Sequence, residues 1–220
     1  MSLPPIESFP ALEALGGLVR HGFVGRVPGV DVALPKAEVL ERLAPYHAAA
    51  VAALGFSPEA LWTAEQVHGA EVARVPQPGL QRIAGVDGLM TNQPGVLLGI
   101  HVADCGAIFV VDPGREAIAL LHSGKNGSQL GILRRAIEAM ERQFGSRPQD
   151  LIVQLGPCIR PPHYEINFPA QIQFDALSAG VPPTQYHDCG TCTHQDAVRY
   201  DSYRRDLGKT GRLLALLGMP

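Results

Sequence analysis

Eight histidines and four cysteines supply the side chains of this sequence best suited to metal chemistry. His68, Cys105 and His122 share one setting, since each closes an apolar run and is followed, directly or one residue later, by glycine. Side chains at strand ends can converge on one point, and glycine lets a ligand approach the backbone. Two imidazoles and one thiolate are ligand types that zinc prefers, and three protein ligands leave a fourth position open. The shared setting therefore predicts one zinc ion per chain, although each residue alone is equally explained as a packed strand-end side chain.

The strands that must position these residues follow from the hydrophobic pattern. Short runs rich in Val, Ile and Leu, separated by Gly, Pro, Asn and Asp, predict strands. They lie at residues 61–67, 71–75, 95–102, 107–111, 117–121 and 151–155, after early strands within residues 1–35. Several runs are apolar throughout, which is typical of strands covered on both faces in a layered α/β protein.

Helical spacing of apolar residues predicts the remaining elements. The expected helices cover residues 35–54, which Pro45 could divide, and residues 128–144, 170–179 and 201–217. No internal repeat or linker separates these elements. We therefore expect an α/β (α+β) protein with a single domain over residues 1–220, in which residues 1–15 form an irregular N-terminal segment.

Composition excludes several classes of protein. With 46% hydrophobic and 18% charged residues, the chain has the make-up of a globular domain. The net charge is -3 and no basic run exceeds two residues, so we expect no nucleic-acid partner. No stretch approaches the roughly 20 apolar residues of a membrane span. The first ten residues lack the pattern of a secretory signal, so the four cysteines predict free thiols in a cytoplasmic protein.

Six motifs are spread along the chain, at residues 66–69 (QVHG), 87–91 (DGLMT), 102–105 (VADC), 122–124 (HSG), 155–159 (LGPCI) and 202–212 (SYRRDLGKTGR). In order and content, residues 21–218 resemble the laccase-domain (multicopper polyphenol oxidase-like) family, also called peptidoglycan editing factor or laccase-domain purine nucleoside phosphorylase. The resemblance implies a three-layer arrangement with a mixed β-sheet core flanked by helices. It also implies metal ligands that match His68, Cys105 and His122.

The same resemblance implies a purine nucleoside phosphorylase that acts on adenosine, inosine and methylthioadenosine, together with adenosine deaminase activity. Copper oxidation is hard to reconcile with the sequence, because eight scattered histidines do not supply several His-rich copper centres. Zinc lowers the pKa of a bound water to about 7, which suits attack at C6 of adenine. The expected partners are a nucleoside and phosphate, bound by a monomer or small homo-oligomer.

Phosphorolysis requires a cationic cradle for phosphate. Arg26, in a segment resembling the family's Phe-x-x-Arg motif, is the first candidate, and Arg204 and Lys125 are further ones. Gln66 could hydrogen-bond a purine edge. Asp104 could orient a ligand histidine or contact substrate, because metal-bound imidazoles usually donate their second N–H to a carboxylate or carbonyl. The ordinary alternatives are a surface arginine for Arg26, a salt-bridged surface group for Arg204 and a turn cap for Asp104.

Two features depart from the family pattern. The second histidine is usually followed by Ala-Gly-Trp-Arg-Gly, whereas residues 123–127 here read Ser-Gly-Lys-Asn-Gly. Lys125 keeps a positive charge, but an ammonium does not replace a planar guanidinium. The second feature is a C-x-x-C with flanking histidines, made of His187, Cys189, Cys192 and His194. It is open to three interpretations: a second metal site, a redox pair or a loop lining the pocket.

Two other functions remain open on the sequence. Cys105 could be the nucleophile of a hydrolase or amidase acting on a cell-wall precursor, with His122 as its base. That mechanism leaves His68 without a task. The loss of the Trp and Arg after His122 also fits a catalytically silent metal-binding paralogue.

Overall fold

The strands divide between two sheets, each with six strands in the part of the chain that the computed structural model describes, residues 3–79 and 81–220. The first sheet has the order β1 (Ile6–Glu7), β2 (Arg20–Val24), β12 (Leu213–Gly218), β7 (Leu97–Val102), β3 (Leu61–Ala64) and β5 (Arg82–Ile83). The second has the order β11 (Tyr186–Asp188), β10 (Ile152–Leu155), β8 (Gly106–Asp112), β9 (Ala117–Ser123), β6 (Gly88–Thr91) and β4 (Val72–Arg74). Both sheets mix parallel and antiparallel pairs: β3 runs parallel to β7, and β8 antiparallel to β9.

Alternation along the strands explains why the two sheets stack. In β8, Ile108 and Val110 face the helices, whereas Phe109 and Val111 face the first sheet. The core between the sheets takes residues from both of them, such as Leu98 of β7. A strand with two apolar faces can be buried only between two layers, so the continuous apolar runs required this arrangement.

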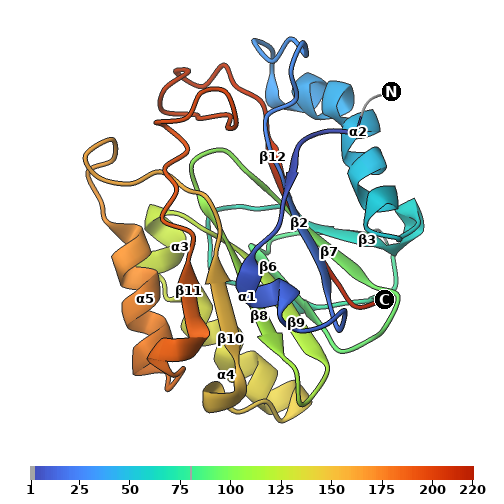
Figure 1. The fold of residues 1–220 in the computed structure, drawn as a ribbon, viewed down its shortest axis with the longest axis vertical. Coiled ribbons are helices and arrows are strands. Elements are labelled where there is room, and N and C mark those ends of the chain that lie inside the picture. Colours follow the sequence, from blue (N-terminus) through green and yellow to red (C-terminus); the bar gives the residue numbers. More distant parts are fainter. Residues whose placement is uncertain (1–2, 80) are drawn as a thin grey trace.

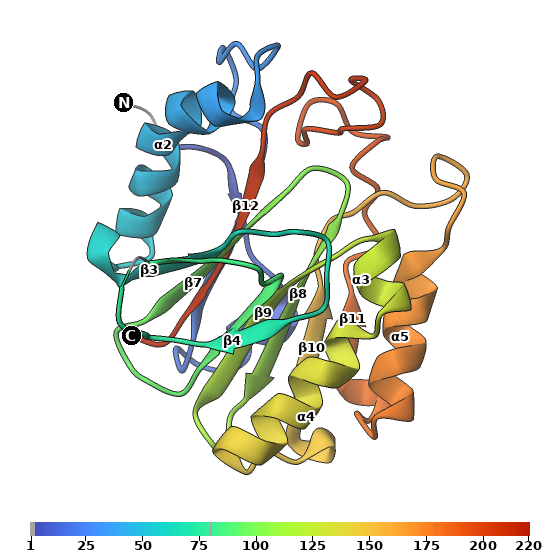
Figure 2. The same ribbon diagram turned by 180° about the vertical axis from the view of Figure 1, so that it is seen from behind.

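Helices cover the two outer faces. α2 (Lys36–Ala53) packs on the first sheet, and α4 (Ile132–Phe144) and α5 (Phe168–Ser178) pack on the second. Figures 1 and 2 show α2 on one side of the stacked sheets and α4 and α5 on the other. The expected α/β class with mixed strands flanked by helices is confirmed, and the second sheet adds a layer to the three that we expected. Within the described residues, no helix combines the length and the hydropathy needed to cross a membrane.

The predicted C-terminal helix over residues 201–217 is wrong. Residues 201–212 form an irregular segment, and β12 follows with every residue buried between β2 and β7. A short, wholly apolar run such as Leu-Leu-Ala-Leu-Leu has no periodicity that separates a buried strand from a buried helix. The partners on both sides decided the conformation.

Two smaller features also differ from the predictions, and a third decides between the alternatives of one helix or two around Pro45. The N-terminal segment is ordered from β1 onward and continues into α1 (Pro10–Glu13), while residues 1 and 2 lie outside the described residues. The helix expected over residues 128–144 is split into α3 (Lys125–Gln129) and α4 by Gly131, which has a φ of 71°. α2 runs through Pro45 as one helix.

Candidate functional site

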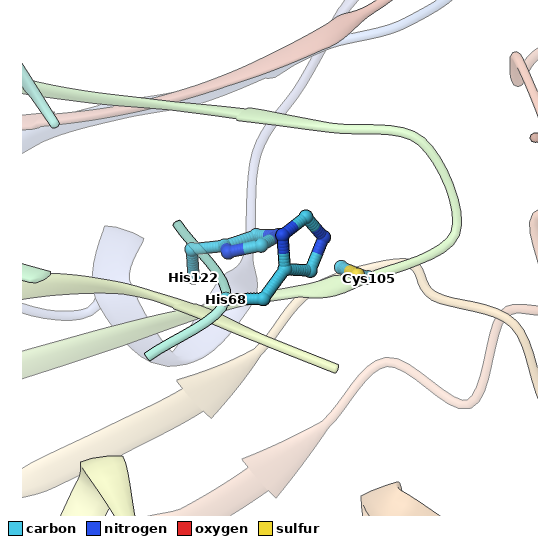
Figure 3. Close-up of side chains that lie close together, drawn as sticks. All are labelled: His68, Cys105 and His122. Atoms are coloured by element: carbon cyan, nitrogen blue, oxygen red, sulfur yellow. The ribbon is translucent and has the colours of Figure 1, made fainter. Parts of the chain in front are cut away.

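Three side chains from separate segments meet at one end of the second sheet. His68 lies in the loop after β3, Cys105 directly precedes β8, and His122 is on β9. The pairing of β8 with β9 places Ala107 opposite His122, so Cys105 lies beside the end of β9. One ligand atom from each of the three lies within 4.8 Å of the others. Figure 3 shows the two rings and the sulfur close together.

Backbone conformation beside the ligands is unusual. Gln66, His68 and Asp104 have φ values of 64°, 61° and 83°, in the left-handed region that non-glycine residues rarely adopt. Such conformations cost about 1–3 kcal/mol each and persist where surrounding contacts enforce them, often at functional sites. A Cβ on Gly124 would lie 2.6 Å from the Cys105 sulfur, so glycine is required after His122. The expected close approach at this glycine is therefore present.

Asp87 is the residue that holds the two histidines in place. Its fully buried carboxylate lies 2.8 Å from Nδ1 of His122 and accepts backbone N–H groups from Val67, His68 and Gly69. Because Nδ1 of His122 is engaged, Nε2 is left as the ligand atom. Sequence reasoning missed this role, although Asp87 begins one of the six motifs.

Asp104 does not contact a ligand histidine. Its carboxylate accepts hydrogen bonds from the Thr193 hydroxyl at 2.7 Å and from the backbone N–H of Arg204 at 2.7 Å. It therefore ties the segment before Cys105 to the loop at residues 189–212. Asp87 has the orienting role that we considered for Asp104, while the contact with substrate considered for Asp104 stays a prediction.

The charges of the three residues match a metal site. Burial opposes ionisation of the Cys105 thiol, but His122 and His68 outweigh it and lower the pKa to about 6. Burial also opposes the charge on His122, yet Cys105 and Asp87 raise its pKa to about 9. At neutral pH the metal-free pair is thus a thiolate and an imidazolium, and a divalent cation can take the place of the proton. Two imidazoles and a thiolate fit zinc.

A cavity of about 620 Å³ opens over these ligands. All three line it, together with four cationic and three aromatic side chains: Lys36, Lys125, Arg204, Arg212, Tyr164, Phe168 and Tyr203. Cavities of this size bind small molecules, and a few polar groups in them set the orientation of the ligand. Arg204 is already paired, since it bonds to Glu165 at 3.1 Å and stacks 4.9 Å from the Tyr164 ring.

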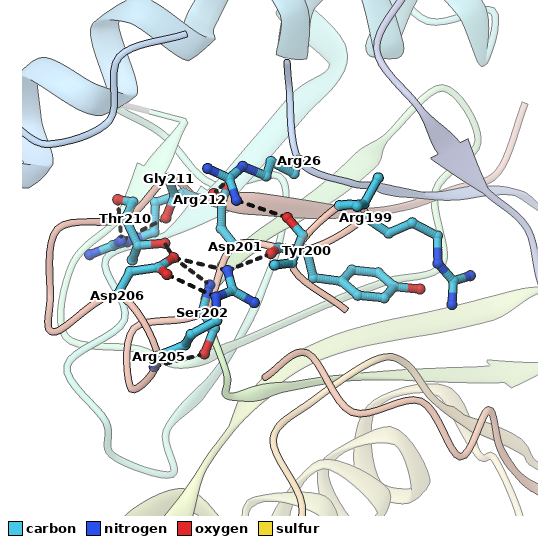
Figure 4. Close-up of polar contacts among 12 residues, drawn as sticks. Arg26, Arg199, Tyr200, Asp201, Ser202, Arg205, Asp206, Thr210, Gly211 and Arg212 are labelled. Atoms are coloured by element: carbon cyan, nitrogen blue, oxygen red, sulfur yellow. Dashed lines mark hydrogen bonds and ion pairs between the residues drawn. The ribbon is translucent and has the colours of Figure 1, made fainter. Parts of the chain in front are cut away.

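Of the three remaining candidates for substrate binding, two line the cavity and one does not. Gln66 and Lys125 line the cavity. Both ends of the Gln66 amide bond to the backbone of His101, at 2.5 and 2.9 Å, so this side chain clamps its loop to β7. Arg26 is not among the described residues that line the cavity. Its guanidinium donates to the carbonyl of Ala197 and lies 3.7 Å from Asp201, as Figure 4 shows for the Asp201 neighbourhood.

The ligating side chains of the C-x-x-C segment do not gather into a second candidate metal cluster among the described residues. In the described part of the chain, His68, Cys105 and His122 are the one group of three or more ligating residues close enough to share an ion. The backbone of Cys192 instead forms an isolated β-bridge with that of Cys158, and all four cysteines are free thiols. The ring of His194 stacks on that of His163, with centroids 4.2 Å apart.

Two further histidines that sequence reasoning did not single out lie in the cavity wall and next to it. His101 lines it, and the rings of His101 and His47 are 5.4 Å apart. Burial lowers the pKa of both, to about 3 for His101, where nearby cations add to the effect, and to about 4 for His47. Both imidazoles are therefore neutral at physiological pH.

This burial predicts an acid-sensitive fold. Below pH 6.5 the unfolded chain protonates His47 while the folded chain does not until about pH 4, so stability falls as the pH drops through this window. Between pH 7.5 and 5.5, His47 alone should lower the free energy of unfolding by about 1.4 kcal/mol. Urea unfolding of chelator-treated wild type and His47→Gln at both pH values measures this difference. Equal pH dependence in the two proteins would contradict the prediction.

The fold and the site together define an α/β protein with two stacked sheets and a candidate His-Cys-His metal centre in a cavity. The chain belongs to the family described as multi-copper polyphenol oxidoreductase laccase, which matches residues 29–178 and 166–220. The family expected from the six motifs is therefore confirmed.

Proteins similar to this chain include named enzymes. It is 32% identical over 203 residues to the purine nucleoside phosphorylase YlmD of Geobacillus stearothermophilus, covering 75% of this chain and 74% of that protein. It is 31% identical over 249 aligned residues to the purine nucleoside phosphorylase of Deinococcus radiodurans, covering 96% and 93%. The crystal structure of the Geobacillus YlmD has a TM-score of 0.79 at 25% identity, covering 96% and 94%. The Bacillus licheniformis hypothetical protein YfiH shares the fold, with a TM-score of 0.83 at 21% identity, covering 92% and 93%.

Proposed function

We propose that this chain is a zinc-dependent purine nucleoside enzyme, which cleaves adenosine, inosine and methylthioadenosine with phosphate and also deaminates adenosine. The observation that carries the proposal is that His68, Cys105 and His122 lie together on the wall of a cavity of about 620 Å³. The purine nucleoside phosphorylases similar to this chain support the substrate class. One zinc per chain accounts for the three ligands.

When bound, zinc would supply a Lewis acid next to the purine ring. Asp87 keeps His122 in the tautomer and orientation that the metal needs. Tyr203 lines the cavity with 56% of its surface exposed, which leaves a ring face for stacking on a purine. In phosphorolysis a phosphate oxygen attacks C1′ of the ribose, and the C1′–N9 bond breaks with its electron pair going to the base. Cationic side chains in the cavity would hold the phosphate in place for this attack.

Incubation of zinc-loaded protein with adenosine or inosine, with and without phosphate, tests the proposal. We expect free base and ribose phosphate only when phosphate is present, and inosine from adenosine in both conditions. Chromatography of the products separates the two reactions. A zinc-loaded, folded protein that turned over no purine nucleoside in either condition would be the silent paralogue instead.

A second candidate function is a cysteine hydrolase or amidase acting on a cell-wall precursor, with Cys105 as nucleophile and His122 as base. The thiolate and imidazolium pair favours it, since the pKa of Cys105 is lowered to about 6. The two functions differ in their need for metal. Chelator treatment should abolish nucleoside cleavage, whereas a cysteine hydrolase would keep or gain activity without metal.

A further inference from the structure

Part of the cavity wall gathers positive charge. Lys36, the first residue of α2, and Arg212, which directly precedes β12, both line it together with His101. Partial desolvation lowers the pKa of the otherwise exposed Lys36, and the charges of Arg212 and Arg82 lower it further, so these cations lie close enough to repel one another. Such repulsion is relieved when an anion binds between the charges.

Two of the cations that line the cavity have no counter-ion among the described residues. Neither Lys36 nor Arg212 forms an ion pair there, whereas Arg204, which also lines the cavity, pairs with Glu165. Among the described residues, Arg212 donates only to the backbone carbonyls of Thr210 and Gly211, at 3.1 and 2.7 Å. The charge of Asp201 acts on Arg212, but this carboxylate pairs with Arg26 at 3.7 Å. Charge for an incoming anion is therefore available.

The surroundings hold Arg212 in position. Arg205 and Asp206 bond to each other at 2.8 Å, and Asp206 accepts from the Thr210 hydroxyl at 3.0 Å, which fixes the loop before Arg212 (Figure 4). The His47 ring lies 5.4 Å from the His101 ring and interacts with the backbone of Arg212, so it supports both residues without lining the cavity itself.

We propose that Lys36, His101 and Arg212 form a phosphate subsite in the wall of the cavity. The subsite rests on the proposed function, because it places the attacking phosphate in the cavity that also holds the metal ligands. The Lys36 ammonium and the Arg212 guanidinium supply the charge-assisted donors that a phosphate dianion requires, and the neutral imidazole of His101 can add one N–H. Either inorganic phosphate or the phosphate group of a nucleotide could supply that dianion. Lys125, the cation nearest to the missing Trp-Arg motif, is not part of it.

Calorimetric titration of zinc-loaded protein with inorganic phosphate, AMP and adenosine tests the subsite. For Lys36→Gln and Arg212→Gln we expect the Kd of phosphate to rise about tenfold or more, which is the effect of losing one charge-assisted hydrogen bond. Adenosine affinity should change less than about threefold. Arg212→Lys keeps the positive charge but loses the two-pronged geometry of the guanidinium, so its Kd for phosphate should lie between those of wild type and Arg212→Gln.

Lys209→Gln and Arg142→Gln are matched controls outside the cavity, and they should bind phosphate as wild type does. Thermal unfolding and zinc content identify a misfolded variant. Glutamine should be tolerated at position 36, because Lys36 is exposed at the start of a helix. One outcome would identify a nucleotide as the source of the dianion. In that outcome, Lys36→Gln and Arg212→Gln bind AMP no more tightly than adenosine, while their Kd for inorganic phosphate is unchanged.

Two results would overturn the subsite: unchanged phosphate and AMP affinity in both glutamine variants, or a loss of affinity in Lys125→Gln alone. Phosphate binding that depends on Lys36 and Arg212 without nucleoside cleavage would keep the subsite and refute the proposed function.

Discussion

Cys105→Ser should lower the zinc content of the purified protein from about one ion per chain to less than about one tenth, and nucleoside cleavage by about a thousandfold or more. A serine hydroxyl keeps its proton at neutral pH, whereas His122 and His68 lower the pKa of the Cys105 thiol to about 6. The thiolate ligand is thus lost while the shape of the side chain is kept. Metal analysis and a product assay measure the two effects.

His68→Asn should have the same effect through a different ligand. Asparagine tolerates the left-handed backbone at this position, where φ is 61°, so the loop keeps its conformation. Cys189→Ser is the control, because Cys189 is half-buried and lies outside the cavity. Full zinc content and activity in both Cys105→Ser and His68→Asn would refute the metal centre.

Asp87→Asn should weaken zinc binding by about 10–100-fold, and it should lower the free energy of unfolding by about 3–5 kcal/mol. The buried carboxylate accepts three backbone N–H groups and faces Nδ1 of His122, and one amide oxygen cannot replace its two oxygens. His122 would lose its orientation and the loop of His68 would loosen. Zinc competition with a chromophoric chelator and urea unfolding of the metal-free protein measure the two effects.

Asp104→Asn is the matched control for this prediction. Asp104 is also buried and accepts two hydrogen bonds, but neither comes from a ligand histidine or its loop. The Asp104→Asn variant should be less stable than wild type, but its zinc affinity should fall less than that of Asp87→Asn. The reverse order of zinc affinities would mean that Asp104, and not Asp87, supports the metal ligands.

The three candidate metal ligands could be picked out from the sequence because their chemistry depends on residue type and local setting. An apolar run that stops at a histidine or cysteine, followed by glycine, marks a strand end with an open approach, and Gly124 beside the Cys105 sulfur shows why. The cationic residues were less predictable. The sequence around an arginine in a loop does not show whether its side chain will line a cavity. Arg26 and Arg212 differ only in the residues that the fold places around them.

Residue type and periodicity alone determined the α/β class, most strands, the helices on the outer faces and the three candidate zinc ligands, because these depend on local patterns a few residues long. Tertiary structure alone decided that residues 213–218 form a central strand, that the strands make two sheets, and that Asp87 supports the ligands. It also brought Lys36 and Arg212, 176 positions apart in the sequence, into the wall of the same cavity. Those outcomes depend on contacts between distant segments, and the energy of such contacts is not encoded in the spacing of neighbouring residues.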